Sequence, residues 1–282
     1  MIKVLESGFF SSIQDSGRFG FAEFGVPVSG AMDLYAYELA NRILNNSLSD
    51  AAIEITLGRA KFQFLVDTEI CISGADFTPT VNDNLVQLNT KIRIKKDDIL
   101  SFGKVNYGVR AYVAVKGGVL SNQILNSRSF YENITEKVRL EKDDVLPILE
   151  YKNDQKSSNT IVKINHHHFK NNILTCYKGP EFELLTKENQ QKLVNKEFTI
   201  SSDNNRMGYK LKEALTDFKK HQILTSAVLP GTVQITPSGV LIVLMRDCQV
   251  TGGYPKILQL TEASINCLAQ KYTHQTINFS LI

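Results

Sequence analysis

The sequence predicts a mostly β protein made of two β-rich halves with a few short helices. Short apolar or alternating segments recur along the chain between Gly and Asp turns, a pattern typical of a sandwich or a barrel. The chain has 282 residues, which is long enough for two domains of ordinary size. A polar stretch divides it, so we expect a first domain over residues 1–155, a connection over 156–172 and a second domain over 173–282.

Composition excludes several classes of protein. Hydrophobic residues make up 43% of the chain and charged residues 22%, as in ordinary soluble proteins. The formal net charge of +3 is too small to indicate binding to nucleic acid or to a membrane surface. No apolar run approaches the ~18 residues of a membrane span, and the N-terminus does not have the pattern of a signal peptide. We therefore expect a cytoplasmic protein.

The cysteines and histidines do not predict a metal site. Cys71, Cys176, Cys248 and Cys267 are far apart, which argues against a zinc site or a disulfide framework and favours reduced thiols. The three adjacent histidines at 166–168 have no accompanying carboxylate, so we interpret them as a strand edge or an exposed turn.

The first half opens with a strand at residues 2–5 and a glycine-rich segment at residues 8–30. A loop of this length in a compact domain is usually functional. Asp33 is expected to cap a helix over Leu34–Leu44, because Asp is a favoured N-cap residue. Strands are then expected at residues 52–57, 61–66, 69–73, 81–88, 91–94, 99–102 and 109–115.

One motif repeats within the first half. The pattern R-[IL]-x-K-D-D-[IV]-L occurs at residues 93–100 and again at residues 139–146. Each Lys-Asp-Asp is a polar turn that leads into an apolar strand, so we interpret the two copies as equivalent structural turns without chemistry.

The second half is organised around the apolar run at residues 240–245, which predicts a strand buried on both faces. The segment 246–255 follows it, and its paired glycines allow successive N–H groups to converge on an anion, although a tight hairpin is the simpler interpretation. Other expected elements are strands at 173–177, 198–200 and 277–282 and helices at 181–193 and 263–271.

A second motif, D-x-x-R-x-G followed by an aromatic residue, occurs once near the start of each half, at residues 15–20 and 203–208. This repetition suggests two related domains, each of which presents an arginine from a turn that contains glycine.

Three blocks of sequence, at residues 14–33, 201–211 and 229–255, resemble the C subunit of 5-oxoprolinase. This protein belongs to a group also described as biotin-dependent carboxyltransferase or allophanate hydrolase subunit 2-like. Residues 111–130 fit the same pattern, so the resemblance covers nearly the full length. It implies cyclophilin-like β-barrel domains. One departure is the segment 130–138, which stands where the family usually has a glycine-rich loop.

The resemblance implies one component of an ATP-dependent 5-oxoprolinase, which converts 5-oxoproline, ATP and water to glutamate, ADP and phosphate. The partners would be proteins similar to the B and A subunits of 5-oxoprolinase, and the chain would be inactive alone. Other members of the group leave two alternatives: a regulatory protein that antagonises a histidine-kinase inhibitor, or a carboxyltransferase acting on urea or an amide. The sequence has neither a Walker A pattern nor a biotin-attachment stretch, so ATP is expected to bind with a partner, and no biotin is expected to be attached.

Amide cleavage driven by phosphorylation requires cations and oriented N–H groups around a developing oxyanion. We therefore assign catalytic roles to the arginines and carboxylates of these blocks: Arg18, Arg206, Asp15 and Asp247. The expected substrate-binding residues are Gln14, Ser29, Gly30, Arg246, Gln249, Thr251, Gly252, Gly253 and Tyr254. For each arginine, a structural salt bridge in a turn is the alternative.

Overall fold

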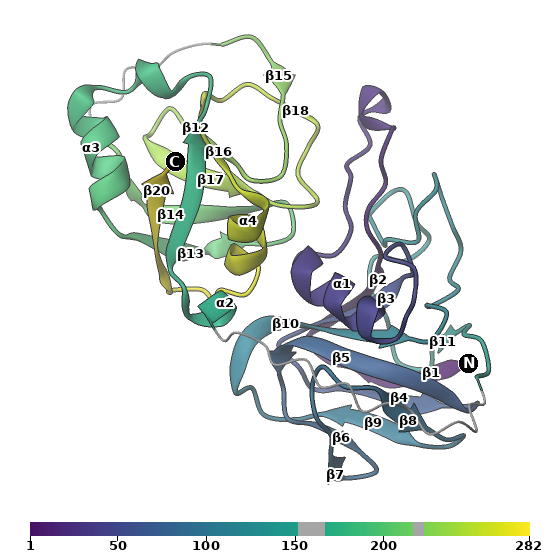
Figure 1. The fold of residues 1–282 in the computed structure, drawn as a ribbon. Helices are drawn as coiled ribbons and strands as arrows, with labels where there is room; N and C mark the ends of the chain where they lie inside the picture. Colours follow the sequence, from purple (N-terminus) through teal and green to yellow (C-terminus); the bar gives the residue numbers. More distant parts are fainter. Residues whose placement is uncertain (152–166, 217–222) are drawn as a thin grey trace. The chain divides into compact units, whose positions relative to one another are not determined.

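The structure, a computed structural model, describes residues 1–151, 167–216 and 223–282. These residues form two compact units that are both mostly β, as predicted (Figure 1). The first unit contains residues 1–18 and 29–151, whereas residues 19–28 group with the C-terminal part of the chain in the second unit. The connection predicted at 156–172 lies largely outside the described residues and stays a prediction. No described helix is long and apolar enough to cross a membrane.

Two antiparallel sheets form the first unit. The six-stranded sheet has the order β11-β1-β4-β9-β6-β7, and the five-stranded sheet has the order β2-β3-β10-β5-β8. Buried apolar side chains of both sheets, such as Phe62 and Val113, belong to one core. The strands are β1 (Ile2–Ser7), β2 (Phe10–Gln14), β3 (Ala52–Thr56), β4 (Ala60–Phe64), β5 (Thr68–Asp76), β6 (Pro79–Val81), β7 (Asn84–Leu85), β8 (Ile92–Ile94), β9 (Ile99–Phe102), β10 (Tyr107–Val115) and β11 (Val145–Leu146).

Helix α1 (Leu34–Ile43) packs on the five-stranded sheet (Figure 1). Tyr37 of the helix shares a buried cluster there with Cys71 and Tyr112. The helix begins where the sequence predicts, because the carboxylate of Asp33 accepts a hydrogen bond from the amide of Ala36 at 3.1 Å. The short 3-10 helix η1 (Ala22–Phe24) lies in the segment between β2 and α1.

The repeated Lys-Asp-Asp motif forms two equivalent turns, as predicted. Asp97 and Asp143 both have a φ of 71°, in the left-handed region that Asp tolerates. The amide of Asp97 donates to the carbonyl of Phe64 at 2.7 Å, and the amide of Asp143 donates to the carbonyl of Val4 at 2.8 Å. The two turns lead into β9 and β11 of the same sheet.

The single strand predicted at residues 81–88 is wrong. Asn82 and Asp83 have φ values of 48° and 64°, which turn the chain back on itself. Two consecutive residues with positive φ are the basis of a tight two-residue hairpin, and here that hairpin joins β6 to β7.

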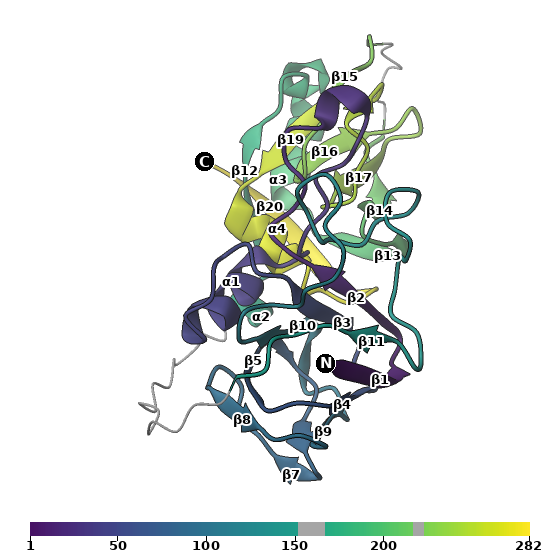
Figure 2. The same ribbon diagram turned by 90° about the vertical axis from the view of Figure 1, so that its right-hand side faces the viewer.

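The second unit is a closed seven-stranded barrel with the order β12-β19-β16-β17-β14-β13-β20 (Figure 2). Strand β20 closes the barrel by pairing in parallel with β12. Its strands are β12 (Ile173–Lys178), β13 (Phe198–Asn204), β14 (Gly208–Ala214), β16 (Thr232–Ile235), β17 (Val240–Leu244), β19 (Lys256–Leu260) and β20 (Thr276–Leu281), with a separate ribbon of β15 (Ser226–Ala227) and β18 (Thr251–Gly252). Its helices are α2 (His167–Lys170), η2 (Phe182–Leu184), α3 (Lys187–Asn195) and α4 (Glu262–Leu268).

Several predicted elements of this unit have different limits. The helix expected at 181–193 is divided, because Thr186 adopts an extended conformation and its hydroxyl caps α3 by accepting from the amide of Asn189. His168 lies in α2 and not in a strand edge or a turn, whereas His166 lies outside the described residues. In β17, Val240 and Ile242 are only partly buried, so the strand is not buried along both faces.

Candidate functional site

In the first unit, Asp15 is the centre of a buried polar cluster. It follows β2 directly and is 4% exposed. Its Oδ1 accepts hydrogen bonds from the amide of Gly17 at 2.8 Å and from the hydroxyls of Ser127 and Ser129 at 2.8 and 2.7 Å. Its Oδ2 accepts one from the amide of Arg128 at 2.6 Å. Because these donors occupy most of the acceptor positions of a carboxylate, the geometry favours a positioning role for Asp15.

The guanidinium of Arg18 is buried beside this cluster, and the residue is 1% exposed. Its Nε donates to the carbonyl of Ile124 at 3.1 Å, and Nη2 donates to the carbonyl of Ser129 at 2.9 Å. Arg18 therefore fixes the same loop that Asp15 holds. These contacts support the structural alternative for Arg18, and its catalytic role stays a prediction.

Two glycines bring the ends of the segment 18–29 close together. Gly17 and Gly30 have φ values of 110° and 88°, and a Cβ on Gly30 would lie 3.0 Å from the Gly17 backbone. Ser29 has a φ of 57° and is 1% exposed, and its hydroxyl has no hydrogen-bond partner among the described residues. The same holds for Oε1 of Gln14. Strained backbone and unpaired buried polar atoms occur often at functional sites, which supports binding roles for Gln14, Ser29 and Gly30.

A second buried group holds the segment before α1. Oε2 of Glu54, in β3, accepts hydrogen bonds from the amide of Met32 at 2.9 Å and from the hydroxyl of Tyr112 at 2.8 Å. That hydroxyl accepts one from the amide of Asp33 at 2.8 Å. Burial, and then the charges of Glu54 and Asp33, raise the pKa of Tyr112 well above its usual value. Sequence analysis missed this group, although a lone Glu inside an apolar strand was a usable signal.

Residues 130–138, which the resemblance marks as a departure from the family pattern, form a turn on the first unit. The amide of Phe130 donates to the carbonyl of Ile13 at 2.9 Å, and its ring packs against the core. The hydroxyl of Thr135 accepts from the amide of Tyr131 at 2.8 Å. Phe130 therefore joins this segment to the core.

In the second unit, Arg206 and Asp247 form an ion pair. Nε and Nη2 of Arg206 donate to the two carboxylate oxygens at 2.6 and 3.0 Å, and the side chains are 12% and 10% exposed. The amide of Asp247 also donates to the carbonyl of Arg206 at 2.8 Å. This is the geometry of a carboxylate that orients an arginine.

The two D-x-x-R-x-G motifs are not equivalent in three dimensions. Asp15 is a buried centre of hydrogen bonds, whereas the side chain of Asp203 is 72% exposed and pairs with Lys210 at 3.2 Å. Arg18 bonds backbone carbonyls, whereas Arg206 bonds a carboxylate. The shared letters therefore describe two different turns.

Arg246 connects the end of β17 to α4. Its guanidinium pairs with both carboxylate oxygens of Glu262, one of them at 3.3 Å, and donates to Oδ1 of Asn266 at 3.1 Å. The side chain of Arg246 is 8% exposed. These contacts give Arg246 a structural role between β17 and α4, and substrate binding by Arg246 stays a prediction.

The Gly252–Gly253 segment belongs to the ribbon of β15 and β18, where Ser226 faces Gly252. The ribbon lies against β16, because a Cβ on Gly252 would be 2.6 Å from Nε2 of Gln234. The pairing differs from the hairpin between two core strands that we took as the simpler interpretation. Binding roles stay predictions for the partly or fully exposed residues of this segment, which are Gln249, Thr251, Gly252, Gly253 and Tyr254.

The cysteines of the chain are poor candidates for a nucleophile. All four are free and buried. Burial raises the pKa of Cys71 and Cys248 to about 12 and that of Cys176 to about 11. The thiolate that would attack a substrate is therefore disfavoured. Among the described residues, no group of three or more His, Cys, Asp or Glu side chains is arranged to hold a metal ion.

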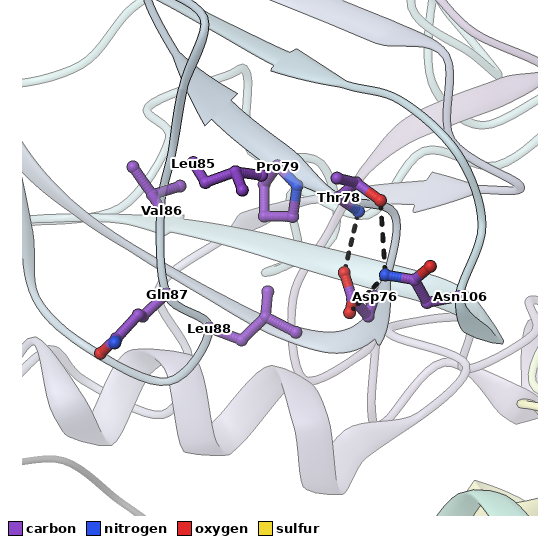
Figure 3. A pocket seen from close by; sticks show the side chains of 8 residues that line it. All are labelled: Asp76, Thr78, Pro79, Leu85, Val86, Gln87, Leu88 and Asn106. Atoms are coloured by element: carbon purple, nitrogen blue, oxygen red, sulfur yellow. Dashed lines mark hydrogen bonds between the residues drawn. The ribbon is translucent and has the colours of Figure 1, made fainter.

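An open pocket of about 630 Å³ lies at one edge of the first unit (Figure 3). The carboxylate of Asp76 accepts hydrogen bonds there from the amide of Thr78 at 2.8 Å and from the side chain of Asn106 at 2.9 Å. None of the predicted site residues lines this pocket, whose other lining residues are Pro79, Leu85, Val86, Gln87 and Leu88. Its carboxylate is engaged with its own neighbours, so we assign it no chemistry.

Comparison with known proteins identifies the family. A family model described as carboxyltransferase domain, subdomain A and B, matches residues 24–281, which include parts of both units. The chain belongs to the carboxyltransferase-domain family. This confirms the resemblance carried by the blocks at 14–33, 201–211 and 229–255.

Within the carboxyltransferase-domain family, the chain is a homologue of the 5-oxoprolinase C subunit. It is 32% identical to the 5-oxoprolinase C subunit of Escherichia coli over an alignment of 284 positions that covers 99% of this chain and 90% of that protein. The corresponding protein of Haemophilus influenzae is 31% identical, over 100% of this chain and 91% of that one. The crystal structure of the K. lactis urea amidolyase has a TM-score of 0.83 and 27% identity and covers 99% of this chain and 18% of that chain.

Proposed function

We propose that this chain is one component of an ATP-dependent 5-oxoprolinase that converts 5-oxoproline, ATP and water to glutamate, ADP and phosphate. One observation carries the proposal: the match to the 5-oxoprolinase C subunit covers 99% of this chain and 90% of the Escherichia coli protein. The name of that relative implies a complex, and we propose partners similar to the B and A subunits of 5-oxoprolinase. We further propose that the chain is inactive alone, that ATP binds together with a partner, and that the complex is cytoplasmic.

In this proposal the chain supplies charge and orientation, and no nucleophile. Phosphorylation of an amide oxygen converts a poor leaving group into a good one, and fixed cations stabilise the charge that develops. Arg206, oriented by Asp247 and 12% exposed, is the best-placed cation of those predicted. Arg18 and Arg246 are engaged within their own units and would position the segments around them.

The test is reconstitution of the chain with its partners, followed by measurement of ADP release with and without 5-oxoproline. The complete set should turn over only with 5-oxoproline. Arg206→Ala should lower kcat/KM by about 10²-fold, which is typical for loss of an oxyanion-stabilising donor. Lys210→Ala, on the surface of the same unit, is the matched control and should leave the rate unchanged. No substrate-dependent ADP release, from partners that are active with another homologue of this chain, would refute the proposal.

Carboxyl transfer to urea or another amide is the second candidate. The K. lactis urea amidolyase, 27% identical over 99% of this chain, favours it. Biotin would have to come from another protein. Two measurements on the reconstituted set distinguish the candidates. A 5-oxoprolinase releases ADP when 5-oxoproline is added, whereas a carboxyltransferase transfers the carboxyl group of a supplied carboxybiotin carrier to urea. The genes next to this one offer a second discriminator, since a neighbouring biotin carboxylase would favour carboxyl transfer.

A further inference from the structure

Lys256, the first residue of β19, has an unusual environment for a lysine at a strand end. Its side chain is only 13% exposed. Nζ donates a hydrogen bond to the hydroxyl of Ser226 at 2.5 Å, and Oε1 of Glu181 lies at 4.0 Å, beyond hydrogen-bond distance. Glu181 is therefore an ion-pair partner of Lys256, but of the three N–H donors of the ammonium group only one makes a hydrogen bond among the described residues.

The backbone of Lys256 is fixed on both sides. Its amide donates to Oε2 of Glu181 at 2.8 Å, and its carbonyl accepts from the amide of Glu181 at 3.1 Å. Gly179 passes so close that a Cβ there would lie 2.2 Å from the carbonyl oxygen of Lys256. On its other side, Lys256 faces Gln234 in β16. A solvated lysine does not require such support, whereas a binding group does.

Ser226 adds a second donor to this group. Its oxygen accepts the hydrogen bond from Lys256, which leaves its own O–H free to donate outward. Ser226 is held by pairing with Gly252 across the β15–β18 ribbon. The ion pair with Glu181 at 4.0 Å offsets part of the cost of burying this charge, and an anion that accepts the spare N–H donors would offset more of it.

We propose that Lys256 and Ser226 form a binding site for a small oxyanion, either a carboxylate or a phosphoryl group. Lys256 supplies the charge and two N–H donors, and Ser226 supplies an O–H donor. The identity of the ligand rests on the proposed function: 5-oxoproline and glutamate carry a carboxylate, whereas ADP and phosphate carry phosphoryl oxygens.

The full chain should be titrated by calorimetry with four probes: 5-oxoproline, glutamate, inorganic phosphate and ADP. One class, carboxylate or phosphoryl, should bind saturably. Lys256→Met should weaken that binding at least about tenfold, as expected for loss of a charge-assisted hydrogen bond, and Ser226→Ala should weaken it by less. Lys178→Met, whose side chain is 55% exposed in the same unit, should bind as the native chain does.

A second measurement needs no variant. The bound probe should slow chemical acetylation of Lys256 in the native chain and leave acetylation of Lys178 unchanged, as measured by mass spectrometry. The acetylation measurement tests the site even if Lys256→Met does not fold. Absence of saturable binding by all four probes, or unchanged acetylation of Lys256, overturns the site. Because binding is measured on the chain alone, it can succeed where the 5-oxoprolinase assay fails, and the two proposals are tested separately.

Discussion

Replacement of Asp15 by Asn keeps the size of the side chain and changes one contact in a defined way. The remaining oxygen can still accept from Gly17, Ser127 and Ser129, but the new NH₂ group would face the amide of Arg128, which now donates to Oδ2 at 2.6 Å. Loss of a charge-assisted hydrogen bond costs about 1.5–3 kcal/mol, and an unpaired buried amide costs about 1–3 kcal/mol more. We expect the first unit to lose about 3 kcal/mol or more of unfolding free energy.

Chemical denaturation followed by circular dichroism and tyrosine fluorescence measures this loss, because the sequence has no tryptophan. Asp203→Asn is the control, since that carboxylate is 72% exposed and its pairing with Lys210 should be worth less than about 1 kcal/mol. If Asp15→Asn is nearly as stable as the native chain and yet abolishes turnover in the reconstituted enzyme, the positioning role is refuted and the catalytic role is favoured.

The four buried thiols should not react with a disulfide reagent at about pH 8 until the chain is unfolded, because burial raises the pKa of Cys248 to about 12; rapid reaction in the native chain would contradict this. Burial also raises the pKa of Tyr112 and of Tyr37 above the usual value of 10.0. Burial of the two neutral hydroxyls therefore contributes fully to the stability of the fold below pH 10.0, and this contribution is lost as the pH rises further. Tyrosinate absorbance during alkaline titration should therefore rise in part only with unfolding, and a fully gradual rise in a folded chain would be the contrary result. Gly179→Ala should destabilise the second unit by about 1–3 kcal/mol in thermal unfolding, because its Cβ would lie 2.2 Å from a backbone oxygen. Gly253→Ala, whose Cβ would meet only the Thr225 hydroxyl at 3.7 Å, should be close to neutral, and equal effects of the two changes would exclude the clash as the cause.

Local chemistry made parts of the fold predictable. Asp33 caps α1 as expected, and the two Lys-Asp-Asp turns have the same geometry because the same residues have the same local preferences. Prediction failed where two adjacent turn residues override the pattern around them. The apolar residues of 81–88 were read as one strand, but Asn82 and Asp83 reverse the chain and divide it into β6 and β7.

The site was less predictable, because its contacts join residues that are distant in sequence. Asp15 and Arg18 were recognised as polar residues in a glycine-rich loop, but their partners come from the segment 124–129. Lys256 was overlooked for the same reason: its importance comes from Glu181 and Ser226, not from its neighbours in the chain. A sequence shows which polar side chains are present, whereas the fold determines which of them already have hydrogen-bond or ion-pair partners.

The parallel pairing of β20 with β12 has a consequence for how the second unit folds during synthesis. Strand β20 also pairs with β13, so both β12 and β13 are left with an unpaired edge until β20, the last strand in chain order, has been made. Open strand edges are templates for association with other chains, and contacts between distant segments form slowly. Until β20 is in place the barrel therefore keeps two open edges, and pairing of those edges with other chains is the expected route of misassembly.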